Sequence, residues 1–262
     1  PFTGRMPTIP RLQRSGQAAM RALCLVLVIS SAGAYDRSLR GGRQSPCHCQ
    51  IDSQHWSRPT RTEPHCVFID LGAGSGADLQ AWAEGKFGPV ANCPSGKWEA
   101  ILVEANPILT ETLNGVAQKY AGKVQVNASR AAYMCEAKTA FYINTNEQQL
   151  KKSSSVSAGF QEASVLGTEL SKVEVDTVNV NRLLTEHTIP GDWVMMKMDV
   201  EGAEFDIIPC MAESPAGSLV DRLYVEQHDP GWGLEGATPS AMQTALTGLR
   251  TRGVDIPAFS PV

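Results

Sequence analysis

The stretch VFIDLGAGSG, residues 67–76, decides the fold of this chain. Its apolar residues lie on both sides of Asp70 and lead into a turn that contains Gly72, Gly74 and Gly76. An apolar run without polar alternation is typical of a parallel strand that is buried on both faces. Glycine lets the following turn bend sharply and approach a ligand closely, because it has no Cβ. The stretch therefore predicts a buried strand followed by a ligand-binding turn.

The spacing of these glycines argues against a dinucleotide as the ligand. Dinucleotide-binding turns place the third glycine three residues after the second, whereas Gly76 follows Gly74 by only two. Asp70 would also repel a pyrophosphate, and an acid beside glycines suits a ligand with a cationic amine, such as the methionine end of S-adenosylmethionine. The alternative is a structural turn that only connects a strand to a helix.

A second apolar run, residues 100–103, ends at Glu104. An acid at the tip of a second parallel strand can accept hydrogen bonds from the two hydroxyls of an adenosine ribose. Pro107 suits the first turn of the next helix, since its missing N–H costs nothing there. Glu104 could otherwise be a solvated residue at a strand end, but its place after the glycine turn favours the ribose role.

Strands and helices alternate along the rest of the chain. This alternation predicts an α/β fold with a mostly parallel, doubly wound sheet and helices on both faces. We expect further core strands at 123–127, 193–199 and 223–227, helices at 78–86, 108–120, 180–187, 203–211 and 240–252, extra strands at 139–143 and 172–175, and a mobile loop at 151–157.

Carboxylates gather in the stretch MMKMDVEGAE, residues 195–204. Asp199 and Glu201 follow an apolar strand, and such a group is costly unless it is solvated, hydrogen-bonded or bound to a cation. His228 ends the next strand, so we expect it to face Asp199 and to act as a general base near its ordinary pKa of about 6.5, shifted by Asp199. A divalent ion on Asp199 and Glu201 is an alternative. For Glu204, helix capping and a functional role are equally supported.

With these motifs the chain resembles the FkbM family of S-adenosylmethionine-dependent methyltransferases. The resemblance spans about residues 64–256 and rests on an ordered series of motifs, which are FIDLGA (68–73), VEANP (103–107), SSSV (153–156), VDT (175–177), KMDVEGAE (197–204) and EQH (226–228). It implies a Rossmann-like class I methyltransferase fold and methyl transfer from S-adenosylmethionine to a hydroxyl of a sugar, glycan or small metabolite.

The same reasoning gives a set of candidate site residues. We expect Asp199 and His228 to be catalytic, with Glu201 in support. The residues expected to bind the cofactor are Asp70, Gly72, Ala73, Gly74, Gly76, Glu104, Ala105, Asn106, Ala131 and Asp199.

Composition and the first residues indicate where the protein acts. A net charge of −4 over 262 residues gives no reason to expect a nucleic-acid partner. Arg21 and the apolar run 22–29 precede small residues that end at Ala34, which is the pattern of a secretory signal peptide and is too short to span a bilayer. We therefore expect a cleaved signal over 1–34, a poorly ordered stalk over 35–63, and a methyltransferase domain over 64–262 in the secretory pathway. An organelle presequence is the alternative.

Cysteine usage agrees with entry into the secretory pathway. Six of the seven cysteines follow Ala34, an even number that a lumenal protein could pair. Cys47 and Cys49 lie near His55, but this spacing is not a standard zinc pattern. We expect a disulfide or free thiols there.

Two other functional classes stay open from the sequence. A nicotinamide-dependent oxidoreductase could use a similar sheet, although the glycine spacing argues against it. A non-catalytic lumenal binding protein could keep the fold without turnover.

Overall fold

A computed structural model divides the chain into two units after residue 42, and residues 43–262 form the second, compact unit. The structure describes residue 47 and residues 55–87, 97–120, 122–144, 154–155, 170–230 and 238–259, all of them in the second unit. The predicted signal segment lies outside the described residues, so its role stays a prediction.

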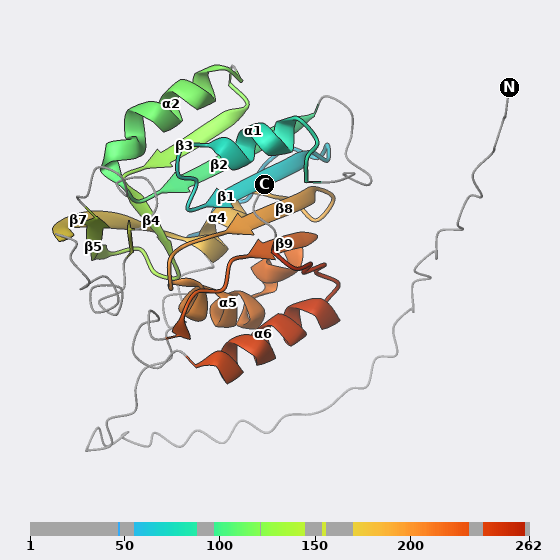
Figure 1. The fold of residues 1–262 in the computed structure, drawn as a ribbon. Helices are drawn as coiled ribbons and strands as arrows, with labels where there is room; N and C mark the ends of the chain where they lie inside the picture. Colours follow the sequence, from blue (N-terminus) through green and yellow to red (C-terminus); the bar gives the residue numbers. More distant parts are fainter. Residues whose placement is uncertain are drawn as a thin grey trace, which may run out of the picture. The chain divides into compact units, whose positions relative to one another are not determined.

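A sheet of five parallel strands forms the centre of the second unit (Figure 1). The strand order is β3-β2-β1-β8-β9, and each strand runs parallel to its neighbours. The strands are β1 (Cys66–Leu71), β2 (Trp98–Glu104), β3 (Val124–Ala128), β8 (Trp193–Met198) and β9 (Arg222–Val225).

Helices cover both faces of this sheet (Figure 1). The helices α1 (Ala77–Ala83) and α2 (Thr110–Gln118), the latter preceded by the short helix η2 (Pro107–Leu109), pack on one face. The helices α4 (Val180–His187), α5 (Glu204–Glu213) and α6 (Pro239–Thr251) pack on the other. Alternate residues of β1 explain the two layers, because Phe68 joins the cluster under α1 and α2 and Ile69 joins the cluster under α4 to α6.

A smaller sheet adjoins the central one through β4 (Arg130–Tyr133). Its order is β4-β7-β5-β6, with β7 at Leu170–Asn179, β5 at Lys138–Asn144 and β6 at Ser154–Ser155. The strand β7 runs parallel to β4 and antiparallel to β5. The extra strands predicted around residues 140 and 173 are therefore confirmed. Ser154 and Ser155 form β6, paired with β5, where a mobile loop was expected over 151–157, and the rest of that stretch lies outside the described residues.

The order of the central strands creates a switch point between β1 and β8. From β1 the chain continues outward to β2 and β3 on one side, whereas β8 and β9 lie on the other. The amide N–H of Asp199 donates to the carbonyl of Leu71 over 2.9 Å, which holds the two strand tips together. Ligands of open α/β sheets bind at such a point, beyond the carboxyl ends of the strands. The predicted fold class is confirmed.

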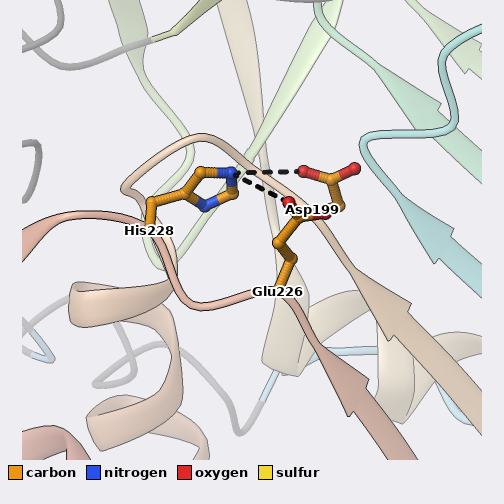
Figure 2. Close-up of side chains that lie close together, drawn as sticks. All are labelled: Asp199, Glu226 and His228. Atoms are coloured by element: carbon orange, nitrogen blue, oxygen red, sulfur yellow. Dashed lines mark ion pairs between the residues drawn. The ribbon is translucent and has the colours of Figure 1, made fainter. Parts of the chain in front are cut away.

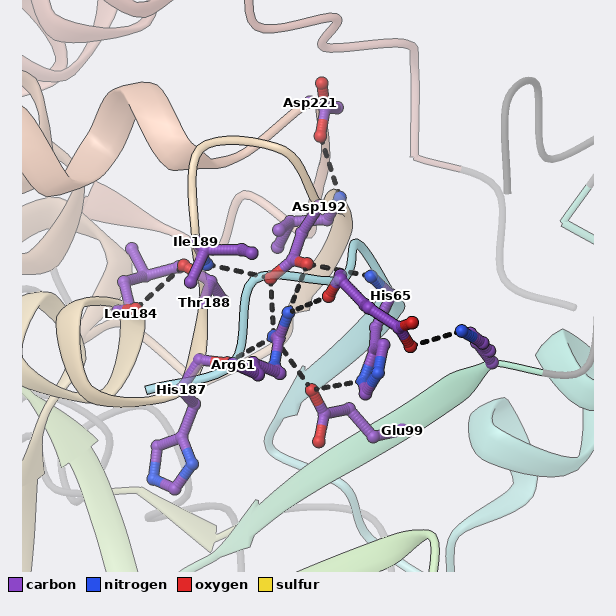
Figure 3. Close-up of polar contacts among 12 residues, drawn as sticks. Arg61, His65, Glu99, Leu184, His187, Thr188, Ile189, Asp192 and Asp221 are labelled. Atoms are coloured by element: carbon purple, nitrogen blue, oxygen red, sulfur yellow. Dashed lines mark hydrogen bonds and ion pairs between the residues drawn. The ribbon is translucent and has the colours of Figure 1, made fainter. Parts of the chain in front are cut away.

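At the opposite edge of the sheet, Arg61 ties the segment before β1 to the domain (Figure 3). Its guanidinium donates two hydrogen bonds of 2.6 Å to the carboxylate of Asp192 and one of 3.0 Å to Glu99. The same Asp192 carboxylate accepts the backbone N–H groups of His65 and Ile189 at 2.8 Å. Residues 55–63, which belong to the predicted stalk, therefore contribute a partly buried contact to the domain.

A disulfide makes a second connection from the predicted stalk. Cys47 is bonded to Cys210 of α5 across 163 residues of sequence, and both lie with Met134 in a small buried cluster. Cys66 and Cys135 are disulfide-bonded as well. Of the two states expected for Cys47, the disulfide is the one observed. None of the helices in the described ranges is long and apolar enough to cross a membrane.

Candidate active site

The glycine turn lies at the switch point, and its glycines serve different purposes. Gly72, at φ 80°, brings the chain so close to β8 that an added Cβ would lie 1.7 Å from the carbonyl oxygen of Asp199. A Cβ on Gly76 would press on Val116 of α2 at 3.1 Å. Gly74, at φ 54°, faces open space, since no heavy atom lies within 4 Å of where its Cβ would be. Gly74 is therefore the position of the turn where a ligand can reach the backbone.

Glu104 at the tip of β2 holds this turn in place. Its Oε2 accepts the N–H of Gly74 at 2.7 Å, and its Oε1 accepts the N–H of Asn106 at 2.6 Å. Burial raises the pKa of Glu104, and the two backbone hydrogen bonds oppose that rise. Each carboxylate oxygen has a second lone pair, so Glu104 can still accept hydrogen bonds from a ligand.

Asp70 and Lys197 form a buried pair beneath the turn. The Lys197 ammonium lies 3.5 Å from Asp70, 3.1 Å from Asp78 of α1 and 3.3 Å from Asp199, and it donates to the carbonyl of Gly72 at 3.0 Å. Burial lowers the pKa of Lys197, but the three carboxylates outweigh burial and raise it. Burial raises the pKa of Asp70 to about 7 although Lys197 opposes the rise. Asp70 therefore supports the turn through Lys197.

Asp199 and His228 lie together, as the strand order predicts. Figure 2 shows the imidazole pointing toward Asp199, which follows β8, and toward Glu226, which follows β9. His228 Nε2 lies 3.6 Å from Asp199 Oδ1, 4.0 Å from Glu226 Oε1 and 3.4 Å from Glu201 Oε2. The predicted proximity is confirmed, whereas the roles of these residues stay predictions.

Glu204, the first residue of α5, fixes the orientation of this imidazole. Its fully buried carboxylate accepts the backbone N–H of His228 at 2.9 Å and lies 3.0 Å from His228 Nδ1. The other oxygen accepts the N–H of Gly202 at 2.8 Å. Glu204 therefore both accepts the N–H of Gly202 just before the helix and directs His228 Nε2 toward the three carboxylates, and a functional role for Glu204 stays a prediction.

The pKa of His228 lies above the ordinary histidine value of about 6.5. Burial lowers the pKa of His228, but the hydrogen bond to Glu204 and the charges of Glu201 and Asp199 outweigh burial and raise it to about 9. Burial and the charges of Asp199 and Glu226 raise the pKa of Glu201 to about 7, and His228 opposes this rise. The expectation named Asp199 as the source of a shift, and the carboxylates of Glu204 and Glu201 also raise the pKa because they lie next to the ring.

The other expected cofactor residues divide into two groups. Ala73 and Asn106 are buried in the loops after β1 and β2, and Ala105 lies beside Asn106. Asn106 also caps η2 by accepting the N–H of Ile108 at 3.0 Å. Ala131 belongs to β4 in the smaller sheet and packs in the apolar core that Leu71 and Val103 share. The loops after β1 and β2 thus carry the expected cofactor residues nearest to Gly74.

Sequence reasoning gave no role to Lys197 or Glu226. Lys197 stands in the apolar run of β8 and is almost fully buried. A lysine inside a strand predicted to be buried on both faces is a signal in itself, because an ammonium is rarely buried without carboxylate partners. Glu226 belongs to the EQH motif, but the motif does not show its neighbours. The pairing of β8 with β9 places Glu226 beside Asp199.

This arrangement fits S-adenosylmethionine as a ligand. Gly74 leaves open space beside a carboxylate that can accept hydroxyl hydrogen bonds, and three further carboxylates surround His228 after β8 and β9, at the same end of the sheet. A cationic ligand suits such an acidic site, whereas a pyrophosphate does not.

Comparison with known proteins agrees with this geometry. The methyltransferase FkbM domain matches residues 70–250, which is more than half of the 262-residue chain and runs from Asp70 to Arg250 in α6. No curated protein and no solved structure matches the chain. The matched region contains the glycine turn, Glu104 and the group around His228, and the chain belongs to the FkbM methyltransferase family.

Proposed function

We propose that this protein transfers a methyl group from S-adenosylmethionine to a hydroxyl oxygen of a sugar, glycan or small metabolite. The observation that carries the proposal is the 2.7 Å hydrogen bond from Gly74 N–H to Glu104, which joins the open glycine turn to the acid of the next strand. That pair lies at the switch point of the sheet, beside the carboxylates of β8 and β9. The family supports methyl transfer, and the donor and acceptor classes are our inference.

The donor subsite is assigned to the tips of β1 and β2. Glu104 accepts the two ribose hydroxyls through lone pairs that the backbone leaves free. Gly74 lets the ligand lie against the backbone. Lys197, which is buried with Asp70, contacts both the carbonyl of Gly72 and the carboxylate of Asp199 and so holds them close together. When bound, S-adenosylmethionine supplies the methyl group. The acceptor oxygen forms a bond to the methyl carbon while the bond from that carbon to sulfur breaks, and its electron pair stays on sulfur.

The acceptor subsite is assigned to the space in front of Asp199, Glu201 and His228. The acceptor hydroxyl must lose its proton as the new bond forms, and a nearby carboxylate is a suitable base. Either Asp199 or Glu201 receives this proton, since both side chains are partly exposed at the turn after β8. Alignment of the oxygen with the methyl group supplies much of the rate, on the order of 7–11 kcal/mol in favourable cases.

Calorimetric titration with S-adenosylmethionine and S-adenosylhomocysteine tests the donor subsite. We expect both ligands to bind, and Glu104→Ala to weaken each at least tenfold, because it removes two ligand hydrogen bonds and the acceptor that holds Gly74. Glu111→Gln, an exposed acid in the first turn of α2, is the matched control and should bind as the wild type does.

The same titration separates the rival functions. Binding of a nicotinamide cofactor in place of S-adenosylmethionine would contradict the proposal and favour an oxidoreductase. Binding of the donor without methylation of any hydroxyl in a screen of glycans and small metabolites would favour a non-catalytic binding protein. Equal affinity in Glu104→Ala and the wild type would remove the assigned donor subsite.

We also propose that the protein acts in the secretory pathway. The apolar run 22–29 before small residues supports a cleaved signal, and four disulfide-bonded cysteines suit an oxidising compartment. Sequencing the mature N-terminus tests this, and a chain that keeps residues 20–34 would contradict it.

A further inference from the structure

Three side chains at the tips of β8 and β9 are placed as a set of metal ligands. Asp199, Glu226 and His228 each offer one ligand atom, and all three atoms lie within 4.8 Å of one another (Figure 2). Ligand atoms about 2.1 Å from one ion lie roughly 3.0–3.5 Å apart. The observed separations from His228 Nε2, 3.6 Å to Asp199 and 4.0 Å to Glu226, need only small side-chain rotations to reach that range.

The charges around this group favour a cation. Carboxylates of Asp199, Glu201, Glu204 and Glu226 all lie within 4.0 Å of a ring nitrogen of His228. The Lys197 ammonium lies 3.3 Å from Asp199 and is shared with the buried Asp70 and the partly exposed Asp78. Four carboxylates around a single imidazole repel one another, and a divalent ion between them offsets this repulsion.

Glu204 supplies the support that a metal-binding histidine needs. A histidine ligand usually donates its second ring N–H to a carboxylate, which fixes the tautomer and the direction of the ligating nitrogen. The buried Glu204 lies 3.0 Å from Nδ1 and also binds the backbone N–H of His228. Nε2 is therefore the nitrogen that faces Asp199 and Glu226.

We propose that Asp199, Glu226 and His228 bind one divalent transition-metal ion that takes mixed oxygen and nitrogen donors, such as Mn²⁺ or Zn²⁺. The imidazole favours these ions over Mg²⁺ and Ca²⁺, which take oxygen ligands. This inference rests on the proposed function for its role, which is to bind the acceptor hydroxyl. The ion lowers the pKa of that hydroxyl as a Lewis acid and is neither oxidised nor reduced. With Asp199 on the ion, Glu201 receives the hydroxyl proton.

Metal binding is tested on the full chain after treatment with a chelator and dialysis. Titration with MnCl₂ followed by electron paramagnetic resonance, and with ZnCl₂ by calorimetry, should show one ion per chain. Glu226→Gln and His228→Gln should weaken binding of the ion at least tenfold, and Glu204→Gln about 10–100-fold through the orientation of His228. Glu213→Gln, an exposed acid at the end of α5, is the matched control and should bind normally.

Two results would overturn the metal site. One is a wild-type chain that binds neither Mn²⁺ nor Zn²⁺ at millimolar concentration. The other is normal ion binding by Glu226→Gln, with thermal unfolding of the variant used to verify that it is folded. Titration of the chelator-treated chain with S-adenosylmethionine keeps the proposals distinct. Donor binding and methyl transfer without an ion would leave the proposed function standing alone, whereas ion binding without donor binding would leave only the metal site.

Discussion

At the scale of single residues, Gly72 and Gly74 are two positions apart and meet opposite surroundings. Both have positive φ values, which cost a residue with a Cβ roughly 1–2 kcal/mol. Gly72 has no room for a Cβ because the carbonyl of Asp199 lies against it, whereas Gly74 faces open space. The first glycine therefore serves the packing of β1 against β8, and the second leaves room for the ligand that we propose.

The two glycines should consequently respond differently to alanine. We expect Gly72→Ala to lower the free energy of unfolding by about 2–4 kcal/mol, since strain and a backbone clash add up. Gly74→Ala should cost only about 1 kcal/mol of stability but weaken S-adenosylmethionine at least tenfold, because its methyl enters the donor subsite. Urea unfolding and calorimetry measure both quantities, and each variant serves as the control for the other. Normal donor affinity in Gly74→Ala would contradict this assignment.

At the scale of elements, Asp192 joins the loop before β8 to the segment before β1. The side chain accepts hydrogen bonds from Arg61, from the N–H of His65 and from the N–H of Ile189 (Figure 3). Glu99 of β2 accepts from the same guanidinium. The amino ends of three neighbouring strands are thus held together, and the tips that carry the site are positioned at their other ends.

This contact predicts a dependence of stability on pH. Burial raises the pKa of Asp192, but the hydrogen bonds from Arg61, His65 and Ile189 outweigh burial and lower it. A lowered pKa stabilises the fold above the unfolded value of about 3.9, and this stabilisation is lost as the pH falls through the folded value. Asp192→Asn should therefore cost about 2 kcal/mol at pH 7 and progressively less below pH 4.

Urea unfolding at pH 7 and pH 3 measures this difference. Asp255→Asn, which removes a partly exposed ion pair with Arg222, is the control and should change stability little at either pH. A destabilisation by Asp192→Asn that is the same at both pH values would show that the carboxylate charge is not the cause.

At the scale of the whole second unit, the disulfide between Cys47 and Cys210 ties the predicted stalk to α5. The same helix begins at Glu204, which orients His228. A crosslink that closes a loop of this length restricts the unfolded chain strongly, because 163 residues separate the two cysteines. The connection therefore stabilises the helix on which the site depends.

Removing this crosslink should lower the thermal stability of the protein. We expect the double variant Cys47→Ser, Cys210→Ser to lose about 2–5 kcal/mol without a reducing agent. Differential scanning calorimetry measures the loss. The double variant is chosen so that no new free thiol is left at either position. An unchanged melting temperature would mean that the buried contacts alone hold this segment in place.

The sequence alone determined the alternation of strands and helices, because this alternation follows from the pattern of apolar and polar residues within each segment. Apolar runs without alternation marked β1, β2 and β8, glycine marked the turn after β1, and the limits of α4 agree with the predicted helix at 180–187. It also placed Asp70, Glu104, Asp199 and His228 at or just beyond strand ends, since each lies at the end of an apolar run or a few residues after it. The bounds of β9 were less well predicted, because the strand ends at Val225 rather than at residue 227.

Tertiary structure alone decided which of these residues act on one another. Three contacts of the site join side chains from different elements. Asp70 is buried with Lys197, Glu204 is hydrogen-bonded to His228, and Glu226 lies close to Asp199. Local patterns carry no information on such distances, and the pKa of His228 depends on every charge around the ring. The sequence therefore determined which chemical groups reach the edge of the sheet, and folding determined their charge, their orientation and their partners.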